Sequence, residues 1–449
     1  MKRQRDLFFR KPTTNPYRIF ILLILIMGGI WLVMQVEQGN IERPFTPTPT
    51  PTRFAQSYAS EGDAQFEAGK LDAAITAYQE AANVDPNNAE VWAKLARIQT
   101  YSSALLTTDD EQRDRLQEGL ASAAKAVELA PDDSATHATR AFVLDWNANA
   151  ILFGEDQAAD YLLEAEQEAV RSIQLDNKNP LALVYYAEIL VDEQKWNQAE
   201  QYVLQALEID ENLMDVHRVY AYVLESFGQY NQAIQEYDKA LAISPNLTFL
   251  HLRAGANYRR LAFGSQNDET RTQLYEKSLE YFAKAARLNE QLGIEDPIPY
   301  LSIAKTYSQE GEYFIAARNI QKALEIDPAN ADTYGQLGIV FFKSRNYEGS
   351  IPALKCAIRG CTAEESCDGR GGCGPNDEPA AVEGLDLSAN TVVYYYTYGS
   401  VLAALSRPKE NYCEEAMLVM DEVKAEFSGS RDIMGIVQAG ESICQSLGE

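Results

Sequence analysis

The chain has 449 residues, enough for one extended domain or two to three compact ones, and its 46% apolar content excludes wholesale disorder. Its net charge of −27 is unevenly placed, with +5 over residues 1–36 and −32 over the rest. A body this acidic repels phosphate backbones, and it contains no long basic run. We therefore do not expect nucleic acid as a partner.

Residues 19–34, IFILLILIMGGIWLVM, form an uninterrupted apolar run, and Gln35 and Val36 extend it before Glu37. Eighteen helical residues span about 27 Å, which is enough to cross the hydrocarbon core of a bilayer. The basic flank over residues 1–18 places that end in the cytoplasm by the positive-inside rule and residue 37 onward outside. A cleaved signal peptide is the alternative, but the basic leader is long and no A-x-A-like site follows. We therefore expect a single-pass signal anchor at 19–36 and an exported body, periplasmic or at the cell surface.

Residues 37–54 include RPFTPTPTPTR, in which four prolines remove backbone donors and fix φ near the polyproline value. This composition predicts a stiff linker that holds the following domain away from the membrane.

From residue 55 the sequence repeats itself. The stretches GKLDAAITAYQEAANVDPNN (69–88), GQYNQAIQEYDKALAISPNL (228–247) and GEYFIAARNIQKALEIDPAN (311–330) share their Gly, Ala, large and Pro positions. Spacings of three and four residues place these side chains on one helical face, and the Pro ends the helix. An amphipathic helix precedes each stretch and carries one small residue where two helices would approach closely. These residues are Gly62, Ala96, Ala141, Ala187, Ala221, Gly255, Ala304, Gly338 and Gly399.

This pattern resembles the tetratricopeptide repeat (TPR) family over about residues 55–427, with Trp92, Leu95 and Ala96 opening one repeat and a period of 34 where uninterrupted. The resemblance implies an all-α, right-handed solenoid of about nine helix-turn-helix repeats, with repeats 1–8 at 55–360. A Cys/Gly-rich insertion at 361–390 and a divergent last repeat with a capping helix at 391–449 follow. The repeats that begin near residues 89, 134 and 248 are longer by 11 or 12 residues, which predicts longer hairpins, either as surface elongation or for binding.

Three histidines, His137, His217 and His251, share the fourth position of their repeats, where Trp92, Tyr58, Tyr300 and Tyr334 stand in others. That position packs between helices, so we expect structural histidines. The sequence has no HExxH, GxSxG, P-loop or GxGxxG motif, and we expect no catalytic residue, no cofactor and no metal.

Six cysteines lie in the last quarter of the chain: Cys356, Cys361, Cys367, Cys373, Cys413 and Cys444. The first four lack the paired C-x2-C or C-x4-C spacing of structural zinc, and no His lies among them. In an exported body we expect three disulfides, with Cys413 to Cys444 the first pairing to test. Zinc or redox chemistry is the alternative. We expect the loop at 361–390, being polar and glycine-rich, to bury no core.

The resemblance implies a concave groove lined by the first helix of each repeat. Its positions give Asp145, Trp146, Glu188, Asp192, Arg218, Tyr222, Arg259, Arg260 and Lys305. The cationic and aromatic members suit an extended, carboxylate-bearing protein segment, although they depart from the Lys/Asn clamp of chaperone-binding TPR proteins. Alternatively, these charges pair with acidic neighbours across the groove.

These features predict a non-catalytic, membrane-anchored scaffold that binds proteins or extended peptides. One alternative is an accessory subunit of a membrane-associated glycan-processing or secretion complex. The other is an enzyme with its site in the cysteine-rich loop.

Overall fold

The structure is a computed structural model that describes residues 15–37, 53–106, 108–374 and 377–447. Two units compose it, residues 1–53 and residues 54–449. The expected basic tail and Pro/Thr-rich linker lie mostly outside the described residues. Over the described ranges the chain forms 22 helices and no strand.

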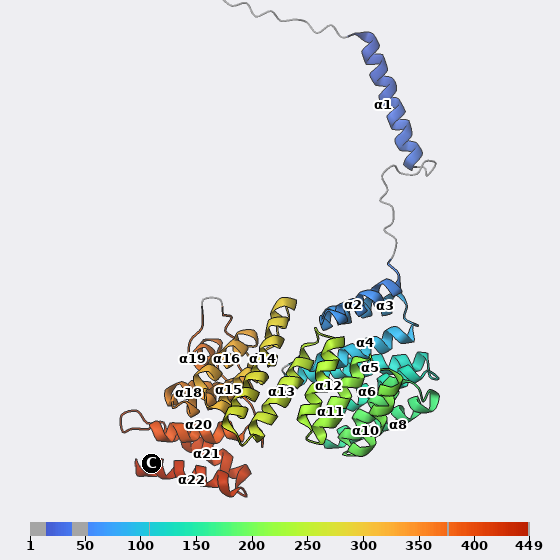
Figure 1. The fold of residues 1–449 in the computed structure, drawn as a ribbon. Coiled ribbons are helices and arrows are strands. Elements are labelled where there is room, and N and C mark those ends of the chain that lie inside the picture. The colour runs from blue at the N-terminus through green and yellow to red at the C-terminus, as the bar shows by residue number, and fades with distance from the viewer. Residues whose placement is uncertain (1–14, 38–52, 107, 375–376, 448–449) are drawn as a thin grey trace, which may run out of the picture. The chain divides into compact units, whose positions relative to one another are not determined.

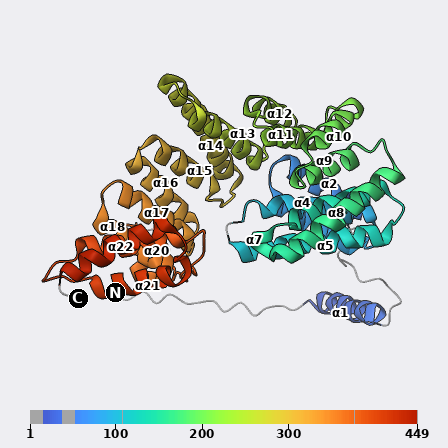
Figure 2. The same cartoon turned by 90° about the horizontal axis from the view of Figure 1, so that it is seen from below.

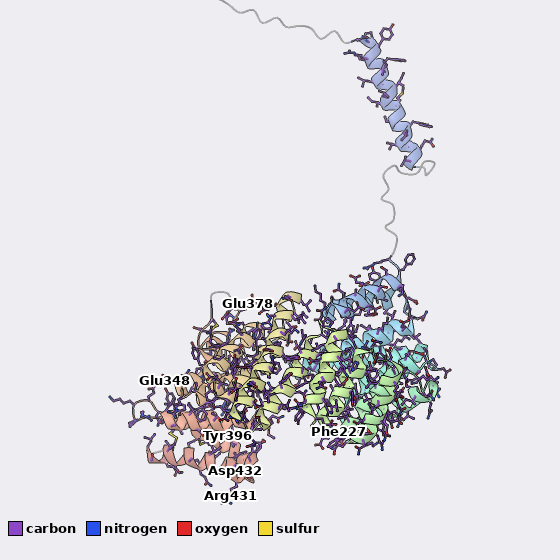
Figure 3. The ribbon with its side chains drawn as sticks, viewed as in Figure 1. Phe227, Glu348, Glu378, Tyr396, Arg431 and Asp432 are labelled. Carbon is purple, nitrogen blue, oxygen red and sulfur yellow. A yellow bond between two sulfur atoms is a disulfide. The ribbon has the colours of Figure 1, made fainter. Side chains whose placement is uncertain are left out.

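The first unit contains one helix, α1 (Pro16–Glu37). Residues Pro16–Val36 have a mean hydropathy of 2.6, and no part of this segment is buried against protein. Its side chains project on all sides (Figure 3), with Phe20 and Leu25 each 64% exposed. An apolar helix of this length has the dimensions needed to cross a bilayer.

Over its described residues the second unit contains nine helix pairs, here called repeats 1–9, and neighbouring pairs contact one another along the chain (Figures 1 and 2). The first helices are α2 (Ala55–Glu67), α4 (Ala89–Ser103), α6 (Ser134–Asn147), α9 (Pro180–Asp192), α11 (Met214–Ser226), α13 (Thr248–Gly264), α15 (Ile298–Glu310), α17 (Ala331–Lys343) and α20 (Val392–Leu405). The second helices are α3 (Leu71–Val84), α5 (Asp109–Leu129), α8 (Glu155–Leu175), α10 (Trp196–Ile209), α12 (Tyr230–Ile243), α14 (Asp268–Leu292), α16 (Tyr313–Ile326), α18 (Tyr347–Arg359) and α21 (Cys413–Phe427). This arrangement confirms the expected all-α solenoid.

Small residues set the distance between the two helices of a repeat. A Cβ added to Gly62 would lie 2.4 Å from the Tyr78 ring, and one added to Gly338 would lie 2.5 Å from Cγ of Leu354. Both partners are fully buried. The helices therefore approach as closely as they do because these positions carry almost no side chain.

The turn inside a repeat uses a left-handed residue at one fixed place. Gly228 has φ +72° and Gly311 has φ +85° at this place, where glycine carries no steric cost. Gln194 and Arg345 occupy the same place in repeats 4 and 8, with φ of 63° and 64°. The backbone turn thus persists where glycine is absent, at the cost of strain.

The side chain at the fourth position of several repeats donates a hydrogen bond to a backbone carbonyl in the preceding turn. His217 donates from Nε2 to the carbonyl of Glu211 at 2.8 Å, and His137 makes the same bond to Pro131 at 2.9 Å. The Trp92 indole makes it to Pro86 at 3.0 Å. Each bond ties the start of a helix to the carbonyl six residues earlier, a structural role of the kind expected for these histidines.

The three long repeats lengthen mainly in their second helices. Helices α5 and α8 each have 21 residues and α14 has 25, whereas most other second helices have 14. In repeat 3 a separate short helix, α7 (Ala150–Phe153), also lies between α6 and α8.

The insertion at 361–390 packs more closely than expected. It contains α19 (Ala363–Gly369), which begins with a capping box between Thr362 and Glu365. Val382 is 5% exposed and Arg370 is 3% exposed, and Arg370 donates to the carbonyl of Leu324 at 3.2 Å. The expectation that this loop buries no core was therefore wrong for these two residues. The Cys356–Cys361 disulfide and the bond from the Leu385 amide to the Ala357 carbonyl hold the loop against repeat 8, and Arg370 holds it against repeat 7.

The last helix, α22 (Arg431–Ser446), closes the array. A disulfide joins Cys413 at the start of α21 to Cys444 in α22, and both residues are fully buried. The other pairs are Cys356 with Cys361 and Cys367 with Cys373. The sulfur–sulfur distances therefore place the six cysteines in three disulfides. One of them joins the capping helix α22 to the last repeat, as expected.

Candidate partner-binding sites

A buried set of charges fills the inside of repeats 2–5. We call it the inner cluster; its members are Arg97, Tyr101, Glu188, Asp215 and Arg218. Arg218 makes two hydrogen bonds to the Glu188 carboxylate, at 2.7 and 2.6 Å. Asp215 accepts from Arg97 and from the hydroxyl of Tyr101. The cluster joins residues 118 positions apart in sequence, so it depends on how the repeats curl.

Each charge in the inner cluster has an opposite charge beside it. Burial alone would raise the pKa of Asp215, but Arg97 and Arg218 hold it below its usual value. The Arg218 guanidinium also lies 5.5 Å from the Tyr101 ring centroid. The cluster is therefore internally neutralised, and its members stabilise the curled array.

An open cavity of about 540 Å³ lies beside the inner cluster, and we call it the acidic cavity. It is lined by Asp145, Trp146, Ala148, Asn149, Ala150, Ile151, Glu188, Asp192, Arg218, Tyr222, Tyr237, Phe249 and Arg253. Asp192 accepts from the Tyr222 hydroxyl at 2.6 Å. Burial raises the pKa of Asp192 to about 6 despite that hydrogen bond, and nearby Glu188 adds to the rise.

A second hollow, about 470 Å³, lies among α13, α15, α17 and α20, and we call it the basic groove. Its lining combines Arg259 and Lys305 with apolar residues such as Leu301, Ile339 and Val393. Arg259 donates to the carbonyl of Ser302 at 3.1 Å. In the described part of the chain, no carboxylate lies within ion-pair distance of Arg259 or Lys305.

The positive charges of the basic groove lie close enough to repel one another. Burial lowers the pKa of Lys305, and the positive charges of Arg259 and Arg260 lower it further. Arg260 differs from the other two, since it pairs with Glu225 at 2.8 Å. Arg259 and Lys305 are therefore the positive charges of this groove that a ligand can neutralise.

The structure divides the nine groove residues expected from the sequence into separate environments. Asp145, Trp146, Glu188, Asp192, Arg218 and Tyr222 line the acidic cavity, whereas Arg259 and Lys305 line the basic groove. Arg218 and Arg260 are paired with acidic neighbours, as the alternative interpretation supposed.

Sequence reasoning missed Arg97, Tyr101 and Asp215. All three stand at the same repeat positions that identified the other groove residues, so that signal was present. Arg253 stands at a different position, and no signal in the sequence marked it as a cavity residue.

The described ranges contain no cluster of side chains suited to binding a metal ion. No group of three or more His, Cys, Asp or Glu side chains is placed to hold an ion there. The three disulfides include all six cysteines.

Comparison with known families identifies the repeat. One model, described as TPR repeat, matches residues 62–100, and another, described as tetratricopeptide repeat, matches residues 219–247. The chain is a tetratricopeptide repeat protein. TPR arrays expose extended concave surfaces for binding, so this TPR protein is a protein-interaction scaffold. No curated protein sequence matches the chain.

Solved structures share the fold at low sequence identity. A human IFIT1 dimer with PPP-AAAA is 17% identical, with a TM-score of 0.52 over 89% of this chain and 92% of that one. A monomeric IFIT1 mutant with Gppp-AAAA is 16% identical, with a TM-score of 0.50 over 88% and 90%. A thermophilic TPR protein of Thermus thermophilus is 18% identical, with a TM-score of 0.37 over 45% of this chain and 98% of that one. The IFIT1 likeness concerns the fold alone.

Proposed function

We propose that this TPR protein is a membrane-anchored scaffold, with its body outside the cytoplasmic membrane, that binds an acidic extended segment of a partner protein in the basic groove. The observation that carries the proposal is the placement of Arg259 and Lys305 among apolar side chains, with no carboxylate partner in the part of the chain that the structure describes. A segment that alternates carboxylate and apolar residues would neutralise both charges and cover the apolar wall.

The acidic body does not prevent such binding. At physiological ionic strength charges are screened over about 8 Å, so the nearest groups dominate the potential at a ligand. Nucleic acid remains an unexpected partner, because a chain with −32 beyond residue 36 repels a phosphate backbone as a whole. The ligands of the IFIT1 structures are not transferred to this chain.

The binding proposal is tested with the full-length protein in detergent and a fluorescent peptide of alternating Glu and Leu, with a Gln–Leu peptide as the uncharged control. We expect the Glu peptide to bind and the Gln peptide to bind at least tenfold more weakly. Lys305→Gln and Arg259→Gln should each weaken binding about tenfold, since each removes a charge-assisted contact. The matched control is Lys277→Gln, which removes a lysine on the exposed face of α14 that pairs with Glu280. Equal binding of both peptides, or equal loss in all three variants, would contradict the proposal.

Membrane topology is tested separately in intact cells, by external protease digestion and mass-spectrometric counting of free thiols. An exported body predicts external cleavage and six oxidised cysteines. Six free thiols on a protected body would overturn the topology and leave the peptide experiment unaffected.

A further inference from the structure

The acidic cavity presents an incompletely satisfied carboxyl pair. Asp145 is only 5% exposed, and its Oδ1 atom has no hydrogen-bond partner in the part of the chain that the structure describes. Its carboxyl group lies close to that of Asp192, which is exposed to the cavity. Burial raises the pKa of Asp145, and the charges of Asp192 and Glu188 raise it further. Neither carboxyl group forms an ion pair with any residue that the structure describes, although the charges of Arg218 and Arg253 act on them through space.

Glu188, the third carboxylate of the cavity, is already satisfied. It holds Arg218 through two hydrogen bonds and accepts from the Trp146 indole at 3.3 Å. Its charge and that of Arg218 cancel locally. Among the described residues, the carboxyl groups of the cavity that form no ion pair are therefore those of Asp192 and Asp145.

An unpaired positive charge lies in the same cavity. The Arg253 side chain lines the wall formed by α13 and is exposed to the cavity. Over the described residues it has no carboxylate within ion-pair distance, although its charge lowers the pKa of Asp192 through space. The cavity therefore offers one free anionic site and one free cationic site.

Aromatic and apolar side chains form the remaining walls. Trp146 and Phe249 line the cavity from α6 and α13, and Tyr222 and Tyr237 line it from α11 and α12. Ile151, from α7, is 74% exposed. A cavity of about 540 Å³ with apolar walls and a few convergent polar groups has the size and character of a small-molecule site.

We propose that the acidic cavity binds a free α-amino acid with an aromatic side chain. The ammonium group lies at the carboxyl groups of Asp145 and Asp192, and the carboxylate lies at Arg253. The side chain packs against Trp146 and Phe249. This binding goes beyond the proposed function, because it uses a different cavity and a different class of ligand.

Each chemical group of the ligand complements one feature of the cavity. An ammonium group supplies the cation that the carboxyl pair lacks, and its three donors can reach more than one oxygen. A carboxylate fits the planar fork of an arginine. Aromatic rings stack on aromatic walls with a gain beyond simple area burial. A ligand with only one charge would leave either Asp192 or Arg253 without an opposite charge in the cavity.

The experiment is calorimetric titration of the full-length protein in detergent with three probes of one shape. L-Phenylalanine carries both charges, phenethylamine lacks the carboxylate, and 3-phenylpropionate lacks the ammonium group. We expect L-phenylalanine to bind and each single-charge probe to bind at least tenfold more weakly. Tighter binding of phenethylamine would show a cation site only, and no binding of any probe would show that the cavity is not a site. Either outcome overturns the proposal.

Variants locate the binding in this cavity. Asp192→Asn and Arg253→Gln should each weaken L-phenylalanine binding at least tenfold, while circular dichroism and the melting temperature confirm folding. Both residues are exposed to the cavity, so neither substitution removes a buried contact. Lys305→Gln in the basic groove is the matched control and should leave L-phenylalanine binding unchanged. Unchanged binding in both cavity variants would place the ligand elsewhere and refute the assignment. If the protein bound L-phenylalanine but not the Glu–Leu peptide, the proposed function of the basic groove would fail and the proposal for the acidic cavity would stand.

Discussion

Replacing Arg218 by Met tests whether the inner cluster holds repeats 2–5 together. The Arg218 side chain is 8% exposed and that of Glu188 is 7% exposed. Removing the guanidinium leaves the Glu188 carboxylate buried, and among the described residues its one remaining donor is the Trp146 indole at 3.3 Å. Breaking one side of a buried pair costs about 3–5 kcal/mol, because the remaining charge stays desolvated.

The loss should appear as a lower unfolding temperature for this part of the array. If residues 89–243 unfold together, an unfolding entropy of about 2.1 cal/mol/K per residue gives roughly 0.33 kcal/mol/K, and 4 kcal/mol lowers the midpoint by about 12 °C. Urea titration followed by tryptophan fluorescence measures the free energy, and Trp146 reports from beside the pair.

The double variant Arg218→Met with Glu188→Met is the decisive control. It leaves no unpaired charge at Glu188, so most of the lost stability should return, with a coupling of about 2 kcal/mol or more in the cycle. A single-variant loss below about 1 kcal/mol would refute the reasoning. So would a double variant whose loss equals the sum of the two single losses.

Three further predictions concern stability. Burial raises the pKa of Asp296 to about 6, so the folded protein binds the extra proton between about pH 4 and 6 and stability falls as pH rises through that window. Asp296→Asn should reduce this fall, measured as melting temperature at pH 4.5 and 7.5; an unchanged pH dependence would contradict it. Replacing both Cys413 and Cys444 by Ser should cost about 3–4 kcal/mol, because the disulfide closes a 31-residue separation, and denaturant titration under oxidising conditions measures it. Arg345→Gly should stabilise the protein by about 1 kcal/mol and Gly228→Ala should destabilise it by about as much, because both positions have left-handed φ. A urea midpoint that falls for Arg345→Gly or rises for Gly228→Ala would refute this.

The helix pairs were predictable from the sequence because each depends on residues close in the chain. The spacing of Ala233, Tyr237 and Ala240 builds one buried helical face within 14 residues. The small residue at Gly62 indicated close approach of its partner helix. The position of His217 within its repeat indicated packing, and its bond to the carbonyl six residues earlier is equally local.

The insertion shows where local composition misleads. Its polar, glycine-rich sequence predicted no buried core, yet Arg370 is buried with a backbone carbonyl as its acceptor. A long polar side chain can be buried wherever the surrounding fold supplies partners, and composition does not record those partners.

The sequence by itself determined the repeats, their turns and the residues that face inward, since side-chain periodicity and turn geometry act over a few residues. Only the tertiary structure decided which inward charges are free. Arg218 and Arg259 occupy groove positions in adjacent repeats. Arg218 lies against Glu188, whereas Arg259 has no carboxylate within ion-pair distance among the residues that the structure describes. The preceding repeat supplies the Glu188 carboxylate to Arg218, 30 residues away. The contact of Arg97 with Asp215, 118 residues apart, forms because small rotations between successive repeats add up over the array. They bring Asn246 to the carbonyl of Glu67, 179 residues away, and so close the inner charges of repeats 2–5 upon one another.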